Sequence, residues 1–200
     1  MGHPYTHVSG APTADDNGYV ILVDMKVGDY NLAATYPPFG ARHVTCKRTI
    51  TDTADTGGTL LITGTDLSGG TISETLTVGA DGVTVTGTKL FATVSKVTGA
   101  AWVVDAVQQT KDQIIVGWDN VNAVATGSGT LHAIVINTTA TSTIVVTDAQ
   151  GTIATIPASV AVGTQYLYDV SYTGFLRVEC GGASDITVIH SGSMPSSYSM

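Results

Sequence analysis

Histidine and cysteine are the side chains in this sequence that most readily bind metals or act as nucleophiles. The chain contains five histidines and two cysteines, which are His3, His7, His43, His132, His190, Cys46 and Cys180. A metal site needs convergent ligands, and no His-x-His, His-Glu-x-x-His or Cys-x-x-Cys spacing brings them together. We interpret the histidines as strand-end or surface residues and the cysteines as small buried hydrophobes, and we expect no metal and no cofactor. For His3 and His7, a metal-binding or inter-subunit role stays open as an alternative.

Serine nucleophiles and phosphate-binding loops have sequence signatures that this chain lacks. It contains no Gly-x-Ser-x-Gly elbow, and its glycines fall between expected strands, not between a strand and a helix. Asp15-Asp16-Asn17-Gly18 offers oxygen ligands for calcium but lacks the rest of an EF-hand loop, so we interpret it as a solvated turn. Paired carboxylates of the glycosidase kind stay open, although their grooves are usually lined with aromatic residues and this chain has only two Trp and three Phe. We therefore expect no catalytic residues and no enzyme.

The composition is typical of an all-β protein. Thr and Val are β-branched and favour strands, while 23 glycines supply turns. A net charge of −8 argues against nucleic-acid binding, which needs clustered basic residues. No apolar run approaches the roughly 20 residues of a membrane span. The first residues lack the basic and apolar regions of a secretory signal, so we expect a protein that is made in a cytoplasm and does not contact membranes.

Two segments near the N-terminus have the character of contact regions. Residues 1–18 are rich in Gly, Pro, Ser, Asp and His without periodicity, which predicts an extended arm that is not a packed element. The Tyr36–Phe39 loop is stiff because it contains two prolines. Its aromatic rings either fill the core or contact a partner. We predict these residues as partner contacts: Tyr5, Val8, Tyr36, Pro37, Pro38 and Phe39.

The two halves of the chain carry similar landmarks in the same order. Each half has a strand with a histidine (His43, His132), a Thr-Asp turn, a Gly-Thr strand and a final strand led by aspartate (Asp112, Asp185). We predict an internal duplication; the alternative is coincidence, because Gly-, Thr- and Val-rich sequences resemble one another by composition alone. Strands spaced about 8–12 residues apart predict a β-sandwich for each copy.

The expected fold is all-β, with two tandem β-sandwich domains of the Ig-like or jelly-roll-like kind and an extended N-terminal arm. Residues 119–129 are small, polar and Gly-rich at their end, which is typical of a linker. Trp102 and Trp118 stand among apolar residues and are expected in the core. The predicted segments are an arm at 1–18, a first sandwich at 19–118, a linker at 119–129, a smaller second sandwich at 130–192 and a tail at 193–200.

Several phrases of this sequence resemble small virion structural proteins of tailed bacteriophages. They are Gly64-Thr-Asp-Leu-Ser-Gly-Gly-Thr-Ile-Ser-Glu-Thr-Leu-Thr-Val, Val85-Thr-Gly-Thr-Lys-Leu-Phe-Ala-Thr-Val and, in the second half, Tyr172-Thr-Gly-Phe-Leu-Arg-Val-Glu-Cys-Gly-Gly-Ala-Ser-Asp-Ile-Thr-Val-Ile. The resemblance covers roughly residues 40–190. Its motifs encode strands and turns, so it carries over no catalytic residue.

Among such proteins, the chain is most similar to capsid decoration (cement) proteins. The resemblance implies a non-catalytic protein on the outer capsid surface of the virion that stabilises capsomer junctions. Its partners would be the major capsid protein and further copies of itself, as a trimer or dimer. Two alternatives stay open: another virion component, such as a tail, baseplate or head-fibre subunit, and a carbohydrate-binding adhesive module.

Overall fold

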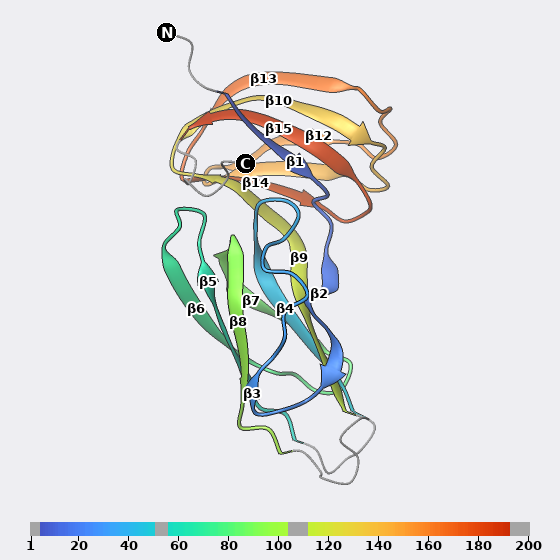
Figure 1. Cartoon of the computed structure of the whole chain (residues 1–200). Coiled ribbons are helices and arrows are strands. Elements are labelled where there is room, and N and C mark those ends of the chain that lie inside the picture. The colour runs from blue at the N-terminus through green and yellow to red at the C-terminus, as the bar shows by residue number, and fades with distance from the viewer. Residues whose placement is uncertain (1–4, 51–55, 104–111, 193–200) are drawn as a thin grey trace.

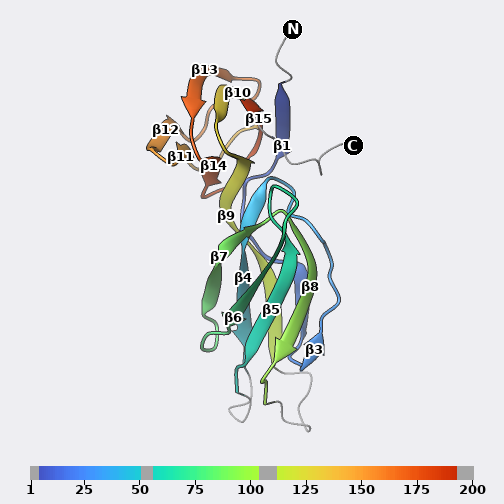
Figure 2. The same cartoon turned by 90° about the vertical axis from the view of Figure 1, so that its left-hand side faces the viewer.

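A computed structural model describes residues 5–50, 56–103 and 112–192. The protein is all-β, as predicted, and all described strand pairs are antiparallel. Figures 1 and 2 show two lobes, one above the other, that share the long strand β9. Lobe 1 contains β2 (Asp15–Asp24), β3 (Gly28–Asp29), β4 (Ala41–Thr49), β5 (Thr59–Thr65), β6 (Thr71–Thr77), β7 (Thr84–Phe91), β8 (Thr93–Ala100) and the first part of β9 (Gln113–Thr126). Lobe 2 contains the rest of β9, β1 (Thr6–Gly10), β10 (Gly129–Thr138), β11 (Ile144–Asp148), β12 (Gly151–Ile156), β13 (Gln165–Tyr172), β14 (Phe175–Cys180) and β15 (Asp185–Gly192).

The two lobes have the same order of paired strands. In lobe 1, one sheet has the order β2-β9-β4-β7 and the other β3-β8-β5-β6. In lobe 2, the corresponding orders are β1-β15-β10-β13 and β9-β14-β11-β12, where β9 takes part through its second half. Each strand of one lobe therefore has a counterpart in the other with equivalent neighbours.

Strand β9 passes from one lobe into the other without a break. Its first half pairs with β4, where Cys46 lies opposite Val116, and its second half pairs with β14, where Glu179 lies opposite Val121. The prediction of an irregular linker at 119–129 is wrong, because this segment contains the end of β9, a turn and the start of β10. Small polar residues are compatible with a strand when both of its edges find partners, as they do here.

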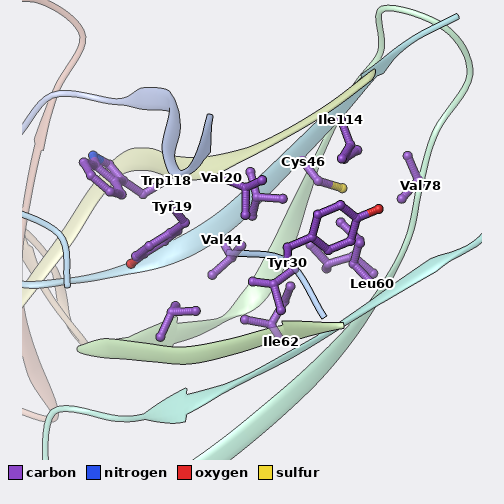
Figure 3. Close-up of a cluster of buried hydrophobic side chains, with 14 of the residues drawn as sticks. Tyr19, Val20, Tyr30, Val44, Cys46, Leu60, Ile62, Val78, Ile114 and Trp118 are labelled. Atoms are coloured by element: carbon purple, nitrogen blue, oxygen red, sulfur yellow. The ribbon is translucent and has the colours of Figure 1, made fainter. Parts of the chain in front are cut away.

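Each lobe encloses its own hydrophobic core. The core of lobe 1 contains Tyr19, Tyr30, Leu60, Ile62 and Trp118, with side chains from both of its sheets pointing toward one another (Figure 3). The core of lobe 2 is built mainly from aliphatic side chains of β10, β11, β14 and β15. Trp102 and Trp118 are buried, which confirms their expected core positions.

Residues 5–18 do not form the predicted free arm, whose first four residues lie outside the described part of the chain. Strand β1 pairs with β15 of lobe 2, from Thr6 opposite His190 to Gly10 opposite Ile186. Residues 15–18, interpreted from the sequence as a solvated turn, are the start of β2. Gly18 and Gly117 are required here, because a Cβ on Gly18 would overlap the ring of Trp118 and one on Gly117 would overlap the carbonyl oxygen of Asp15. Polar composition predicted an arm, but long-range pairing decides the structure of this segment.

Candidate functional site

The six predicted contact residues divide into two groups. Tyr5 and Tyr36 are 60% and 64% exposed, and Pro38 is also on the surface. Val8, Pro37 and Phe39 are instead turned toward the chain's own interior. As contact residues for a partner, the last three are corrected: their apolar groups are already covered within this chain. The prediction of a contact surface is thereby narrowed to Tyr5, Tyr36 and Pro38.

Phe39 links the two lobes. It precedes β4 of lobe 1, yet its side chain is 1% exposed and belongs to the core of lobe 2, together with Leu131 and Leu176. Val8, on β1, packs against the same core. The proline-rich loop and the N-terminal strand therefore both supply apolar groups to lobe 2 from outside its contiguous sequence.

The loop and the N-terminal segment also lie against each other. Gly10 has a φ of 151°, and a Cβ at this position would overlap the carbonyl oxygen of Pro38. Only glycine permits this close approach of the two backbones without strain. The two segments predicted separately as contact regions thus form one continuous region at the junction of the lobes.

The buried side chain of Arg42 links the backbone segments that meet at this junction. Its side chain is fully buried, and Nε donates a hydrogen bond to the carbonyl oxygen of Phe39 at 3.1 Å. The two terminal nitrogens donate to carbonyl oxygens of Ala11 and Thr13, and one of them reaches Asp119 O at 3.4 Å. A guanidinium suits this position because its donors lie in one rigid fork and serve several acceptors at once. Arg42 therefore fastens the N-terminal segment to both the loop and β9.

Asn122 completes the attachment on the other side of the segment. It is fully buried in β9, and Nδ2 donates to the carbonyl oxygens of Pro12 at 3.2 Å and Val178 at 3.0 Å. These bonds link the N-terminal segment to β14 of lobe 2. Together, Arg42 and Asn122 hold residues 11–13 against the junction by their backbone, whatever the side chains of those residues are.

An open groove of about 550 Å³ runs beside this junction. It is lined by residues 13–17 together with Pro38, Ile115 and Trp118. The carboxylate of Asp15 accepts a hydrogen bond from the backbone N–H of Asn17 at 3.1 Å, which is a local turn interaction. Within the described ranges, no group of three or more acidic, histidine or cysteine side chains is arranged to hold a metal ion.

A second cluster of polar side chains lies on the outer face of the β1-β15-β10-β13 sheet. His132 Nδ1 lies 2.7 Å from a carboxylate oxygen of Asp169, and His132 Nε2 lies 3.1 Å from the hydroxyl oxygen of Ser191. The ring of Tyr5 meets the imidazole edge-on, with centroids 4.6 Å apart. These four residues come from β10, β13, β15 and the segment before β1, so the sheet brings together groups that are far apart in sequence.

Backbone irregularities place this cluster. Relative to β15, His132 is the extra residue of a β-bulge, because Leu131 and Ala133 pair with the consecutive residues His190 and Ile189. Relative to β13, the extra residue is on the other strand, where Tyr168 and Asp169 stand opposite His132 alone. Asp169 on β13 has a positive φ of 48°, a conformation that non-glycine residues rarely adopt. A bulge re-aims the side chain it carries, and here it turns His132 toward Asp169.

Lobe 1 contains a related histidine–aspartate pair. His43 Nδ1 lies 2.6 Å from Asp119 Oδ2, and His43 also occupies a position where the register of β4 shifts. Among the described residues, the other ring nitrogen of His43 has no hydroxyl partner. The two lobes therefore share the His–Asp pair, but only lobe 2 extends it to a serine.

Of the other described histidines, His7 is exposed, whereas His190 is fully buried and so is not the strand-end or surface residue that the sequence predicted. Burial, together with the nearby His132 and His7, lowers the pKa of His190 to about 4, so its imidazole is neutral at pH 7. Burial raises the pKa of the Cys46 thiol to about 12, which leaves almost no reactive thiolate. Cys46 and Cys180 are both free and buried, which confirms their interpretation as core hydrophobes.

Sequence reasoning did not find the Ser191–His132–Asp169 cluster or the Arg42 junction. Ser191 and His132 are separated by 59 positions and Asp169 and His132 by 37, and no spacing motif connects them. Arg42 and Asn122 donate mainly to backbone carbonyls, and these acceptors carry no sequence signal. One indication of these sites was present in the sequence: His43 and His132 occupy matching positions in the two halves, which predicted similar surroundings for the two histidines.

A comparison of the chain with protein-family models finds no match, and no curated protein is significantly similar to it. No helix among the described residues is long and apolar enough to cross a membrane.

Proposed function

We propose that this protein is a structural component of a tailed-bacteriophage virion that binds the outer capsid surface and stabilises junctions between capsomers. The observation that carries the proposal is a set of large apolar side chains exposed outside both cores: Tyr5, Ile21, Leu22, Tyr36 and Leu167. Large apolar side chains that are exposed in the free protein can become the buried anchors of a contact with another protein. Its partners are the major capsid protein and further copies of the same chain, as a dimer or trimer. This role needs no catalysis and no cofactor.

The shared β9 strand and the Arg42 junction favour a role that requires stiffness. Because β9 takes part in sheets of both lobes and Arg42 fastens the N-terminal segment between them, the lobes cannot separate without breaking buried hydrogen bonds. A stiff body loses little conformational entropy when it docks, so more of the contact energy contributes to affinity. The net charge of −8 suits the outside of a shell, away from packaged DNA.

We further propose that the two lobes are sandwich domains that arose by internal duplication. Three features support this: the equivalent strand orders, the histidine at a bulge in β4 and in β10, and an aspartate-capped hairpin turn in each lobe. Asp66 accepts from the N–H groups of Ser68 and Gly70, and Asp148 accepts from those of Gln150 and Gly151. Composition alone produces β-branched strands, but it does not produce the same pairing order twice.

The test is to mix the purified protein with undecorated, expanded capsids of its phage and to image the particles. We expect density on the shell at capsomer junctions. The double variant Tyr5→Ser/Tyr36→Ser should bind at least tenfold more weakly, since it removes exposed apolar contacts without touching either core. Val83→Ser, at an exposed position between β6 and β7, is the matched control and should bind like the original protein. Binding to tails or baseplates with bare shells would overturn the capsid assignment.

A further inference from the structure

We propose that Ser191, His132 and Asp169 form a nucleophilic triad on the outer face of lobe 2, which accepts acyl groups from small activated esters. This site does not depend on the proposed structural role, although Tyr5 and Leu167 belong both to its cleft and to the exposed apolar set. It rests on the arrangement of three side chains from three neighbouring strands, β15, β10 and β13.

The hydrogen bonds of His132 determine what each of its nitrogens does. A carboxylate only accepts hydrogen bonds, so the neutral imidazole carries its proton on Nδ1, where Asp169 lies 2.7 Å away. Nε2 is then the acceptor and faces the Ser191 hydroxyl at 3.1 Å. The order of acid, imidazole and hydroxyl is the one that serine nucleophiles require: the base is within hydrogen-bond reach and is itself oriented by a third group.

The backbone around the triad is shaped to hold it. His132 is the extra residue of a β-bulge relative to β15, and Asp169, which has a positive φ, lies in an irregularity of β13 opposite His132. Both features disturb regular pairing, and non-glycine residues rarely adopt a positive φ. A regular ladder would lack both features, and His132 would not be re-aimed toward Asp169.

A shallow cleft of about 280 Å³ lies beside the triad and defines the substrate class. Its apolar lining comes from Leu167, Ile189 and Ala133, and Tyr5 and His7, at the start of β1, also line it. Of the triad, His132 and Asp169 line this cleft, and its size suits a short acyl or aryl group held beside the imidazole whose Nε2 faces Ser191. The ring of Tyr5 also packs edge-on against His132 and limits rotation of the imidazole.

The reaction that follows is ester hydrolysis through an acyl-serine. Ser191 Oγ attacks the ester carbonyl carbon while His132 Nε2 takes the hydroxyl proton, and the imidazolium is stabilised by the Asp169 carboxylate. The C–O bond to the leaving group then breaks, and His132 returns the proton to the departing oxygen. Water attacks the acyl-serine with His132 as base and releases the carboxylic acid, so that ester and water become acid and alcohol.

The exposure of the site limits its power. The side chain of Asp169 is 76% exposed, and the cleft is open, so water supplies much of the stabilisation of the developing oxyanion. Loss of one preorganised oxyanion donor costs about 10²–10³ in rate. We therefore expect reaction with phenyl esters and fluorophosphonates, whose leaving groups need little assistance, and none with amides.

The test is to treat the intact protein with a fluorophosphonate probe and to locate the label by peptide mass spectrometry. We expect one label at Ser191, together with hydrolysis of p-nitrophenyl acetate. Ser191→Ala should abolish both, and His132→Gln should slow labelling by about 10²-fold, the lower end of the range for a general base. Asp169→Asn should slow it by about tenfold, because this exposed carboxylate is partly replaced by water.

Two controls within the chain show whether Ser191 is labelled because His132 activates it or only because its hydroxyl is exposed. The hydroxyl of Ser9 is hydrogen-bonded to Thr187 Oγ1 at 2.7 Å and not to a histidine that could act as a base, so Ser9 should not react. His43→Gln removes the equivalent His–Asp pair of lobe 1, and it should leave labelling of Ser191 unchanged. Thermal unfolding of each variant shows whether the fold is retained. The proposal is overturned if Ser191 is labelled no faster than Ser9, or if a folded His132→Gln variant is labelled at the original rate.

Discussion

Lobes 1 and 2 have the same strand order but are assembled from the chain in different ways. Lobe 1 is formed by one continuous stretch, from β2 into the first half of β9. Lobe 2 takes its edge strand β1 from the N-terminus, shares β9 with lobe 1 and receives Phe39 from the loop before β4. The same topology can thus be self-contained or dependent on distant segments, and the difference predicts unequal stability.

The strongest test of this asymmetry is deletion of residues 1–10, which removes β1. We expect the free energy of unfolding of lobe 2 to fall by about 5 kcal/mol, since several strand hydrogen bonds of about 1 kcal/mol each and the packing of Val8 are lost. Native-state hydrogen exchange should show lost protection in β15 and β10 but not in β5. Tyr5→Ser, which keeps the strand, is the control. Equal loss of protection in both lobes would contradict the asymmetry.

Phe39→Ala is the next largest change. Removing a buried aromatic ring costs about 3–5 kcal/mol, and the loss should appear in lobe 2 although residue 39 precedes a strand of lobe 1. Phe91→Ala, which empties an equally buried site in the core of lobe 1, is the matched comparison. Hydrogen exchange in β14 and β8 distinguishes the two. If Phe39→Ala weakened β8 more than β14, the assignment of Phe39 to lobe 2 would be wrong.

Arg42→Lys sharpens the comparison at the junction. Lysine keeps the charge but cannot serve the carbonyl groups of Phe39, Ala11 and Thr13 from one planar fork, so we expect a loss of about 2–3 kcal/mol. Urea unfolding measures the change, and faster exchange of β1 amides locates it. Arg177→Lys, at a residue stacked over Phe175, should cost less than 1 kcal/mol. A stable Arg42→Lys variant with unchanged β1 protection would show that the fork is dispensable.

Acidification should weaken lobe 2 by a smaller amount through His190. Its pKa is lowered to about 4 in the folded protein from the ordinary 6.5, so the unfolded chain takes up a proton between these values and the folded chain does not. Stability is therefore lost as the pH falls from about 6.5 to about 4, by at most about 3 kcal/mol. Chemical unfolding at several pH values should show this slope, and His190→Gln should reduce it. An identical slope in the variant would exclude His190 as the cause.

The local features of the fold were predictable from residue types. β-branched residues and glycine-rich turns predicted an all-β chain, and apolar surroundings predicted buried positions for Trp102 and Trp118. Turn chemistry also helped, because the Thr-Asp turns around Asp66 and Asp148 form the expected hairpins. Residues 6–10 and 15–18 of the predicted arm and residues 119–126 of the predicted linker are strands, because small polar residues join a strand as readily as a loop when a partner edge is available.

The candidate sites were less accessible to sequence reasoning than the fold. Of the predicted partner contacts, Tyr5, Tyr36 and Pro38 lie on the surface, whereas Phe39 belongs to the core of lobe 2 and Val8 packs against that core. Whether an apolar residue in a polar segment is exposed depends on which distant surface lies beneath it. The contacts of His132 with Asp169 and Ser191 likewise depend on the register of β10 against β13 and β15.

By itself, the sequence determined the fold class, the acidic charge and the two similar sets of landmarks, because these follow from composition and from contacts between neighbours in the chain. Only the tertiary structure decided that β1 completes lobe 2, that β9 belongs to both lobes and that Ser191 meets His132. These features depend on pairings between residues far apart in sequence. A one-residue change of register would send each side chain to the opposite face of its sheet.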